Sequence, residues 1–167
     1  MDKIVLDIET SCLCGSGQEY SICCQPFHNK VKVPVTAEAL MRSRFTAYAQ
    51  KNDSYLLETW DSAKKPKSID FSKEEVIWTK LSIVKLKKGS EKDSKGIVEF
   101  KAYYSLDNEL YVMNEISRFI KVAGRWLYLD GVVKSVAKAD QQSNQGKNAL
   151  CSCGSGKKFK RCCGKKL

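Results

Sequence analysis

Two side chains that often do chemistry are missing from the middle of this sequence. No cysteine lies between Cys24 and Cys151, and the only histidine, His28, lies near the N-terminus. The middle segment therefore lacks the residues that most often serve as nucleophile or general acid–base group. An enzyme there would depend on aspartate or glutamate, so a hydrolase or isomerase is a lesser alternative.

Long apolar runs are also missing. No stretch approaches about 18 apolar residues, the length that predicts a membrane-spanning helix. The opening stretch, MDKIVLDIETS, contains Asp2, Asp7 and Glu9 and lacks both a basic segment and a continuous apolar run, so it does not resemble a secretory signal. We therefore expect a cytoplasmic protein whose thiols stay reduced.

The two ends of the chain contain the same cysteine pattern. Residues 12–24 read CLCGSGQEYSICC, and residues 151–163 read CSCGSGKKFKRCC. Both copies have the spacing C-x-C-x8-C-C, and an aromatic residue, Tyr20 or Phe159, precedes the third cysteine by three positions. The shared spacing and residue types indicate two copies of one folding unit.

Four cysteines in each copy suit a structural zinc ion, which takes four ligands in a tetrahedron and prefers thiolates. In the second copy, Gly154 and Gly156 allow the positive φ of a tight turn that points two sulfurs inwards. So small a unit needs a stabilising cross-link such as a metal ion, and metal binding then supplies its folding free energy. The sequence predicts two zinc ions per chain, bound by Cys12, Cys14, Cys23, Cys24, Cys151, Cys153, Cys162 and Cys163.

Other uses of these cysteines are less well supported. A disulfide framework would need an oxidising compartment, iron–sulfur clusters usually have different cysteine spacings, and a redox pair more typically reads C-x-x-C. Within the first copy one alternative stays open. His28 follows Cys24 by four residues and can replace it as the fourth ligand.

The segment CSCGSGKKFKRCCG resembles the SEC-C motif, the zinc knuckle at the C-terminus of the SecA translocation ATPase. This resemblance implies zinc binding by the same eight cysteines. The first copy departs from the motif, because Gln18 and Glu19 replace the lysines and Gln25 replaces the closing glycine. The whole chain resembles the YchJ family, which has a SEC-C motif at each end of a nuclear-transport-factor-2-like (NTF2-like) domain; the similar middle stretches are AEALMRSRFTAY, LLETWD and ISRFIKVAGRWLYLDG.

The middle segment predicts helices followed by an antiparallel sheet. Thr36 is the expected N-cap of a first helix, and Asn52 and Asp53 start a second, short one through SYLLETW. Strands are expected over 76–87, 98–104, 109–122 and 126–129, with a charged loop over 87–96 and a hairpin turn at VAGRW. This order indicates an α+β fold, and the resemblance implies the NTF2-like, cystatin-like cone, a curved antiparallel sheet that wraps a helix. The apolar face of the first helix is formed by Ala37, Leu40, Met41, Phe45 and Tyr48.

These patterns divide the chain into four parts: an N-terminal knuckle (1–30), an α+β domain (31–134), a linker (135–149) and a C-terminal knuckle (150–167). Pro26 and Pro34 lie in the short first connection, so we expect the N-terminal knuckle to pack on the α+β domain. The second connection is rich in Gln, Asn, Ser and Ala, which indicates a flexible tether. As an alternative, a helix extends partway through VVKSVAKADQQ.

A pocket is expected inside the cone, around Arg44, Trp60 and Glu115. Arg44 falls on the apolar face of the first helix, and Glu115 alternates with its neighbours along a strand. A buried Arg44–Glu115 pair is the functional interpretation. The favoured interpretation is structural: an ion pair at the mouth of the cone, or an arginine that extends to water.

Charge distinguishes the two knuckles. The chain has a net charge of +10; residues 144–167 contain seven basic residues and no acid, whereas residues 1–30 contain two lysines and four acids. The resemblance to SecA implies that the C-terminal knuckle contacts an acidic protein surface, such as that of the SecB chaperone. The second hypothesis is RNA or ribosome binding, with Phe159 stacked on a base. In both, the contacting residues are Lys157, Lys158, Lys160 and Arg161.

Overall fold

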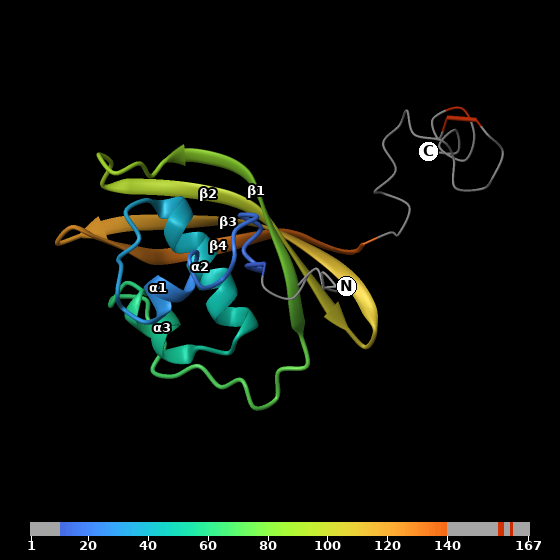
Figure 1. Ribbon diagram of the computed structural model, residues 1–167, viewed down its shortest axis with the longest axis horizontal. Helices are drawn as coiled ribbons and strands as arrows, with labels where there is room; N and C mark the ends of the chain where they lie inside the picture. The colour runs from blue at the N-terminus through green and yellow to red at the C-terminus, as the bar shows by residue number, and fades with distance from the viewer. Residues whose placement is uncertain (1–10, 140–156, 159–160, 162–167) are drawn as a thin grey trace, which may run out of the picture. The chain divides into compact units, whose positions relative to one another are not determined.

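The computed structural model describes residues 11–139, 157–158 and 161. The chain divides into two compact units, Met1–Ala137 and Lys138–Leu167. The helices come first and the strands follow, which confirms the predicted α+β order (Figure 1). The elements are α1 (Gln25–His28), α2 (Ala37–Ala49), α3 (Asp53–Glu58), β1 (Ile77–Lys88), β2 (Lys95–Leu106), β3 (Glu109–Val122) and β4 (Arg125–Lys138).

The four strands form one sheet in the order β1-β2-β3-β4, with antiparallel pairing of β1 with β2 and of β2 with β3. Ala123 and Gly124 both have positive φ, as a two-residue hairpin turn between β3 and β4 requires, so the predicted turn at VAGRW is confirmed. The pairing of β1 with β2 shifts register twice, and such irregularities bend a strand. The sheet curves, and the three helices lie on one face of it (Figure 1).

The core lies between α2 and this sheet. The Thr36 side chain accepts a hydrogen bond from the Ala39 N–H at 3.1 Å, so the predicted N-cap is confirmed. Four residues of the predicted apolar face of α2 belong to this core, whereas the fifth, Tyr48, packs in a second cluster that contains Phe71. Burying the apolar side chains is the main favourable term for this domain. The core residues are Ala37, Leu40, Met41, Phe45, Leu81, Val98, Phe100, Ala102, Phe119 and Trp126.

Helix α2 is also buried on its opposite faces, which the apolar pattern did not predict. Ser43, Thr46 and Ala47 have exposed fractions of at most 1%. Their small side chains let neighbouring segments approach closely. The Ser43 hydroxyl, for example, is 2.7 Å from the hydroxyl of Tyr55, which lies next to Leu56 in α3. The helix therefore joins the sheet to the segments that cover it.

Strand β4 is longer than expected, because it continues to Lys138 and so includes residues 135–138 of the predicted linker. The alternative of a helix in this segment is wrong up to Lys138. The β-branched side chains Val132, Val133 and Val136 favour the extended backbone, and all three are exposed. The charged loop before β2 is shorter than predicted and covers residues 89–94. Among the residues that the structure describes, no helix is both long enough and apolar enough to cross a membrane.

Candidate metal centre

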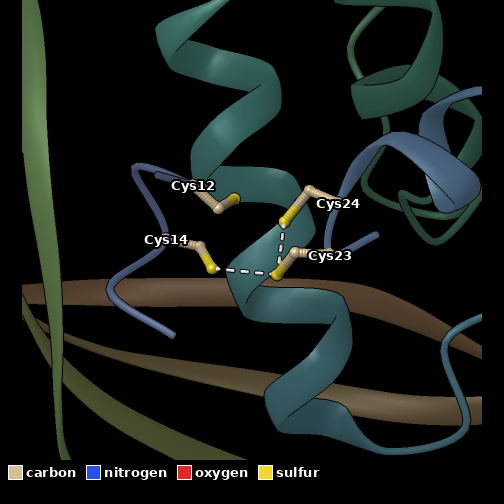
Figure 2. Close-up of side chains that lie close together, drawn as sticks. All are labelled: Cys12, Cys14, Cys23 and Cys24. Atoms are coloured by element: carbon tan, nitrogen blue, oxygen red, sulfur yellow. Dashed lines mark hydrogen bonds between the residues drawn. The ribbon is translucent and has the colours of Figure 1, made fainter. Parts of the chain in front are cut away.

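Four cysteine sulfurs meet beside α2 (Figure 2). The Sγ atoms of Cys12, Cys14, Cys23 and Cys24 all lie within 4.8 Å of one another. The sulfurs of Cys14 and Cys23 are 3.5 Å apart, and those of Cys23 and Cys24 are 3.9 Å apart. Three of the side chains are buried, and Cys23 is half-buried. The structure thus brings together the four ligands predicted for the first copy.

The spacing of these sulfurs fits a tetrahedral metal ion. Zinc–sulfur bonds of about 2.3 Å place the sulfurs of a tetrahedral site about 3.8 Å from one another. A disulfide would need two sulfurs at about 2.05 Å, whereas all four cysteines here are free thiols. The cluster can therefore hold a metal ion of the kind that prefers thiolate ligands.

His28 does not join the cluster. Its Nε2 donates a hydrogen bond to the carbonyl of Ser43 at 2.8 Å, and its Nδ1 lies 2.9 Å from the hydroxyl of Tyr20. The bond from Nε2 holds the N-terminal segment against α2, and the contact of Nδ1 with Tyr20 lies within that segment. Of the two alternatives for the fourth ligand, the geometry favours Cys24.

The GSG segment between the cysteines is shaped by its glycines. Gly15 and Gly17 both have φ of +77°, the conformation expected for the equivalent Gly154 and Gly156, which lie outside the described residues. A β-carbon on Gly15 would lie 2.3 Å from the carbonyl oxygen of Leu81 in β1, so this position also requires the absence of a side chain. The segment therefore forms a tight turn that fits against the sheet.

Hydroxyl groups support the sulfurs from two sides. The Ser16 hydroxyl lies 3.1 Å from the Cys23 sulfur. The Thr46 hydroxyl, on α2, lies 3.5 Å from the sulfur of Cys24 and 3.6 Å from that of Cys12. Groups in these positions orient metal ligands and tune their affinity. The sequence predicted neither contact, although Ser16 belongs to the repeated motif.

The N-terminal knuckle packs on the α+β domain, as predicted. Arg42 of α2 donates from Nη1 to the carbonyl oxygen of Cys14 at 2.6 Å, and its guanidinium also pairs with Glu38 at 2.9 Å. Together with the contact of Gly15 with β1, this fixes the first cysteine turn against both a helix and a strand. The site is therefore part of the domain's own packing.

The pKa values of Cys14, Cys23 and Cys24 are shifted within the cluster. Hydrogen bonding from the Cys12 thiol holds the pKa of Cys14 well below its usual range, whereas the hydrogen bond with Cys12 raises the pKa of Cys24. Burial raises the pKa of Cys23 to about 11. A bound divalent cation deprotonates its thiol ligands outright, whatever their pKa without the metal.

The predicted ligands of the second copy, Cys151, Cys153, Cys162 and Cys163, lie outside the described residues, as does Lys160. Of the predicted basic surface, Lys157, Lys158 and Arg161 are described and exposed. The Arg161 N–H donates a hydrogen bond to the Lys158 carbonyl at 2.8 Å. The second zinc ion stays a prediction.

Of the three residues predicted to form a pocket in the cone, Arg44 and Glu115 line one cavity, whereas Trp60 is not part of its lining and contacts Arg44 instead. Arg44 is only 2% exposed, and its guanidinium carbon lies 5.1 Å from the ring centroid of Trp60. Glu115 lines the same cavity as Arg44. Among the described residues no carboxylate oxygen lies within 4.0 Å of Arg44. A direct Arg44–Glu115 ion pair is therefore wrong, and so is an arginine that extends to water.

Comparison with protein families matches residues 36–131 to "YchJ, middle NTF2-like domain" and residues 10–26 and 148–165 to the SEC-C motif. A UPF0225 protein from Serratia proteamaculans is 41% identical over 160 residues, which cover 92% of this chain and 97% of that protein. A UPF0225 protein from Vibrio vulnificus is 39% identical over 165 residues, covering 92% and 98% respectively. The predicted resemblance is thus confirmed along most of the chain.

Two solved structures have the same fold. The solution structure of a SEC-C motif containing protein from Rhodopseudomonas palustris is 33% identical, with a TM-score of 0.66, and covers 75% of this chain and 99% of that one. The crystal structure of a SEC-C motif containing protein from Psychrobacter arcticus is 28% identical, with a TM-score of 0.62, and covers 95% and 98% respectively. These likenesses confirm the NTF2-like α+β fold.

Proposed function

Because this chain belongs to the YchJ family, in which an NTF2-like domain is combined with SEC-C motifs, we propose that it is a zinc-binding adaptor protein. The N-terminal knuckle is a structural zinc site built into the NTF2-like domain. The C-terminal knuckle binds a second zinc ion and contacts an acidic surface on a partner protein. We place this activity in the cytoplasm, where the thiols stay reduced.

The observation that carries the proposal is the cluster of four cysteine sulfurs within 4.8 Å of one another. Thiolates are soft ligands that select zinc over magnesium, calcium and manganese. Catalytic zinc sites keep one position open for water or substrate, whereas structural sites take four protein ligands. Since cysteine supplies all four corners here, the N-terminal site has the ligand set of a structural zinc ion.

The packing of the N-terminal knuckle supports a division of labour between the two motifs. Arg42, Thr46 and the backbone of Leu81 cover its inner surface, and residues 1–30 carry more acids than bases. The C-terminal knuckle belongs to a separate compact unit, and residues 144–167 contain seven basic residues and no acid. Clustered positive charge attracts an anionic surface over long range, so we assign partner binding to this end.

The partner class follows from this charge and from the resemblance to SecA, which implies an acidic protein such as the SecB chaperone. A second candidate function, binding to RNA or the ribosome, is favoured by the same exposed cations, Lys157, Lys158 and Arg161. Both partners would bind less tightly at high salt. Salt dependence alone therefore does not separate them.

Capture of partners with and without nuclease separates the two. Zinc-loaded full-length protein is used as bait, together with two variants that each lose four positive charges. The test variant replaces Lys157, Lys158, Lys160 and Arg161 with Gln; the matched control replaces four other exposed lysines, Lys65, Lys67, Lys92 and Lys101. The proposal predicts acidic proteins that stay bound after nuclease, are lost with the test variant and are kept with the control. Capture that nuclease abolishes would favour RNA, and capture equal in both variants would contradict the assigned surface.

Phe159 gives an independent comparison of the two partner classes. In the first copy, the equivalent Tyr20 packs against the cysteine cluster. We therefore expect Phe159 to fill the small core of the C-terminal knuckle, so that Phe159→Leu weakens folding of the knuckle more than it weakens binding. If Phe159 instead stacks on a base, the same change would weaken RNA binding by roughly 1–3 kcal/mol while zinc stays bound.

A further inference from the structure

A cavity of about 140 Å³ lies inside the NTF2-like domain, between α2 and the sheet. Much of its wall is apolar and aromatic, with Phe45 on the helix side and Trp78, Phe100 and Met113 on the strands. For comparison, an engineered cavity of about 150 Å³ in another protein binds benzene. The space therefore suits a compact apolar group about the size of one ring.

The helix side of this cavity carries a buried positive charge. Arg44 is 2% exposed, and its Nη1 donates to the carbonyl of Leu56 and the hydroxyl of Thr59, both at 2.7 Å. Its guanidinium carbon lies 4.5 Å from the ring centroid of Tyr128. These acceptors are neutral, and no carboxylate oxygen of the described residues lies within 4.0 Å of Arg44. Burying a charge without a counter-ion is costly.

The carboxyl group of Glu115, on β3, lines the same cavity but forms no direct ion pair with Arg44 within 4.0 Å. Its Oε1 accepts a hydrogen bond from the hydroxyl of Ser117 at 2.8 Å. Burial raises the pKa of Glu115, so this acid loses its proton less readily than an exposed one. A β-carbon on Gly131 would lie 2.1 Å from Oε1, so the glycine leaves room for the carboxyl group where it stands. The cavity thus contains a buried guanidinium without a direct ion pair, and a carboxyl group whose pKa burial raises.

We propose that this cavity binds a small monocarboxylic acid with a compact apolar body, whose carboxylate pairs with Arg44. The planar guanidinium matches a carboxylate in two parallel hydrogen bonds, and an apolar surrounding strengthens such a pair. The body of the ligand lies among Phe45, Trp78, Phe100 and Met113. A cationic ligand would be repelled by Arg44, and a neutral one would leave the guanidinium without a counter-ion. This site is independent of the knuckles, so it goes beyond the adaptor function.

The test uses zinc-loaded full-length protein and two probe carboxylates, benzoate and the smaller 3-methylbutanoate. Binding is measured by calorimetry and by tryptophan fluorescence. Trp78 lines the cavity, and the ring of Trp60 contacts the guanidinium of Arg44. Benzamide is the neutral comparison, because it has nearly the shape of benzoate without its charge. We expect at least one carboxylate to bind saturably, and benzoate to bind between roughly tenfold and a hundredfold more tightly than benzamide.

Three variants locate the site. Arg44→Gln removes the charge, and Ala102→Val fills part of the cavity while keeping Arg44. The control Arg118→Gln removes an exposed arginine that pairs with Asp130 on the surface. We expect about a tenfold or larger loss of carboxylate affinity in the first two variants and none in the control. If Arg44→Gln does not fold, Ala102→Val and the comparison with benzamide still test whether the carboxylate binds in this cavity.

Three results would each overturn the proposal. The first is that neither carboxylate binds at millimolar concentration to protein shown to be folded and zinc-loaded. The second is that benzamide binds as tightly as benzoate, and the third is that Ala102→Val leaves the affinity unchanged. A failure of partner capture by the C-terminal knuckle would leave these binding measurements untouched, so the two proposals can fail separately.

Discussion

The hydroxyl oxygen of Thr46 lies 3.5 Å from the sulfur of Cys24, so a helix of the NTF2-like domain donates a hydrogen bond into the N-terminal cysteine cluster. The same side chain lies 3.6 Å from the sulfur of Cys12. Thr46 is 1% exposed, which means that the cluster shields it from water. The candidate metal site and the packing of α2 therefore share this residue, and we expect a change in one to perturb the other.

Thr46→Val removes the hydroxyl group with little change in side-chain volume. We expect it to weaken zinc binding at the N-terminal site by roughly tenfold or more, because supporting hydrogen bonds of this kind tune ligand basicity and orientation. Thr46→Ser keeps the hydroxyl and should bind zinc nearly as the parent protein does. Competition with a chromophoric chelator measures the affinity. Equal affinity in all three proteins would show that the contact does not support the metal site.

Removing the metal should leave the NTF2-like domain folded. Its core between α2 and the sheet contains no cysteine, so its apolar burial does not need zinc. The covered face of α2 would still lose packing. We expect chelation under reducing conditions to lower the midpoint of thermal unfolding by on the order of 5 °C, which corresponds to a modest loss of free energy. Loss of the cooperative transition would contradict the independence of this domain.

Gly15→Ala should destabilise the protein more than Gly17→Ala does. Both glycines have φ of +77°, so each substitution carries the strain of a left-handed conformation, roughly 1–2 kcal/mol. Only at Gly15 does the added carbon meet backbone, the Leu81 carbonyl oxygen at 2.3 Å; at Gly17 nothing lies within 4 Å. We expect the free energies of unfolding in urea to differ by about 1 kcal/mol or more. Equal losses would mean that the knuckle does not sit against β1 as described.

Alkaline pH should destabilise the fold through Tyr55. Burial raises the pKa of Tyr55 to about 12 from its ordinary value of 10.0, and its hydroxyl lies 2.7 Å from that of Ser43. Between these values the unfolded chain loses the phenolic proton before the folded protein does, so stability falls as pH rises from about 10 to about 12. Tyr55→Phe should make this part of the pH profile of the unfolding free energy less steep. An unchanged slope in Tyr55→Phe would contradict this assignment.

The parts that sequence predicted correctly depend on short-range patterns. The cysteine spacing is local, so the four sulfurs of the first copy were identified before their geometry was known. The Thr36 cap and the VAGRW turn are also local, and each was confirmed. The apolar period of α2 identified the face that meets the sheet, because only that face is apolar.

The parts that sequence did not predict depend on contacts between distant segments. Ser43 and Thr46 are polar, yet both are buried, because the N-terminal knuckle and α3 cover the faces that would otherwise contact water. The hydrogen bond from Arg42 to the Cys14 carbonyl joins residues that are 28 positions apart. The end of β4 was missed because Lys134 and Ser135 interrupt its valines, and that composition is typical of a linker as well. No local pattern would have placed Arg44 over the ring of Tyr128.

The central claim is that both SEC-C motifs of this chain bind zinc through four cysteines each. Native mass spectrometry of the reduced protein tests it most directly. The account predicts the mass of two zinc ions, eight unmodified thiols after denaturation, and the loss of one zinc ion in Cys14→Ser and of the other in Cys153→Ser. Iron, disulfides, the absence of metal, or retention of both zinc ions in either variant would contradict it.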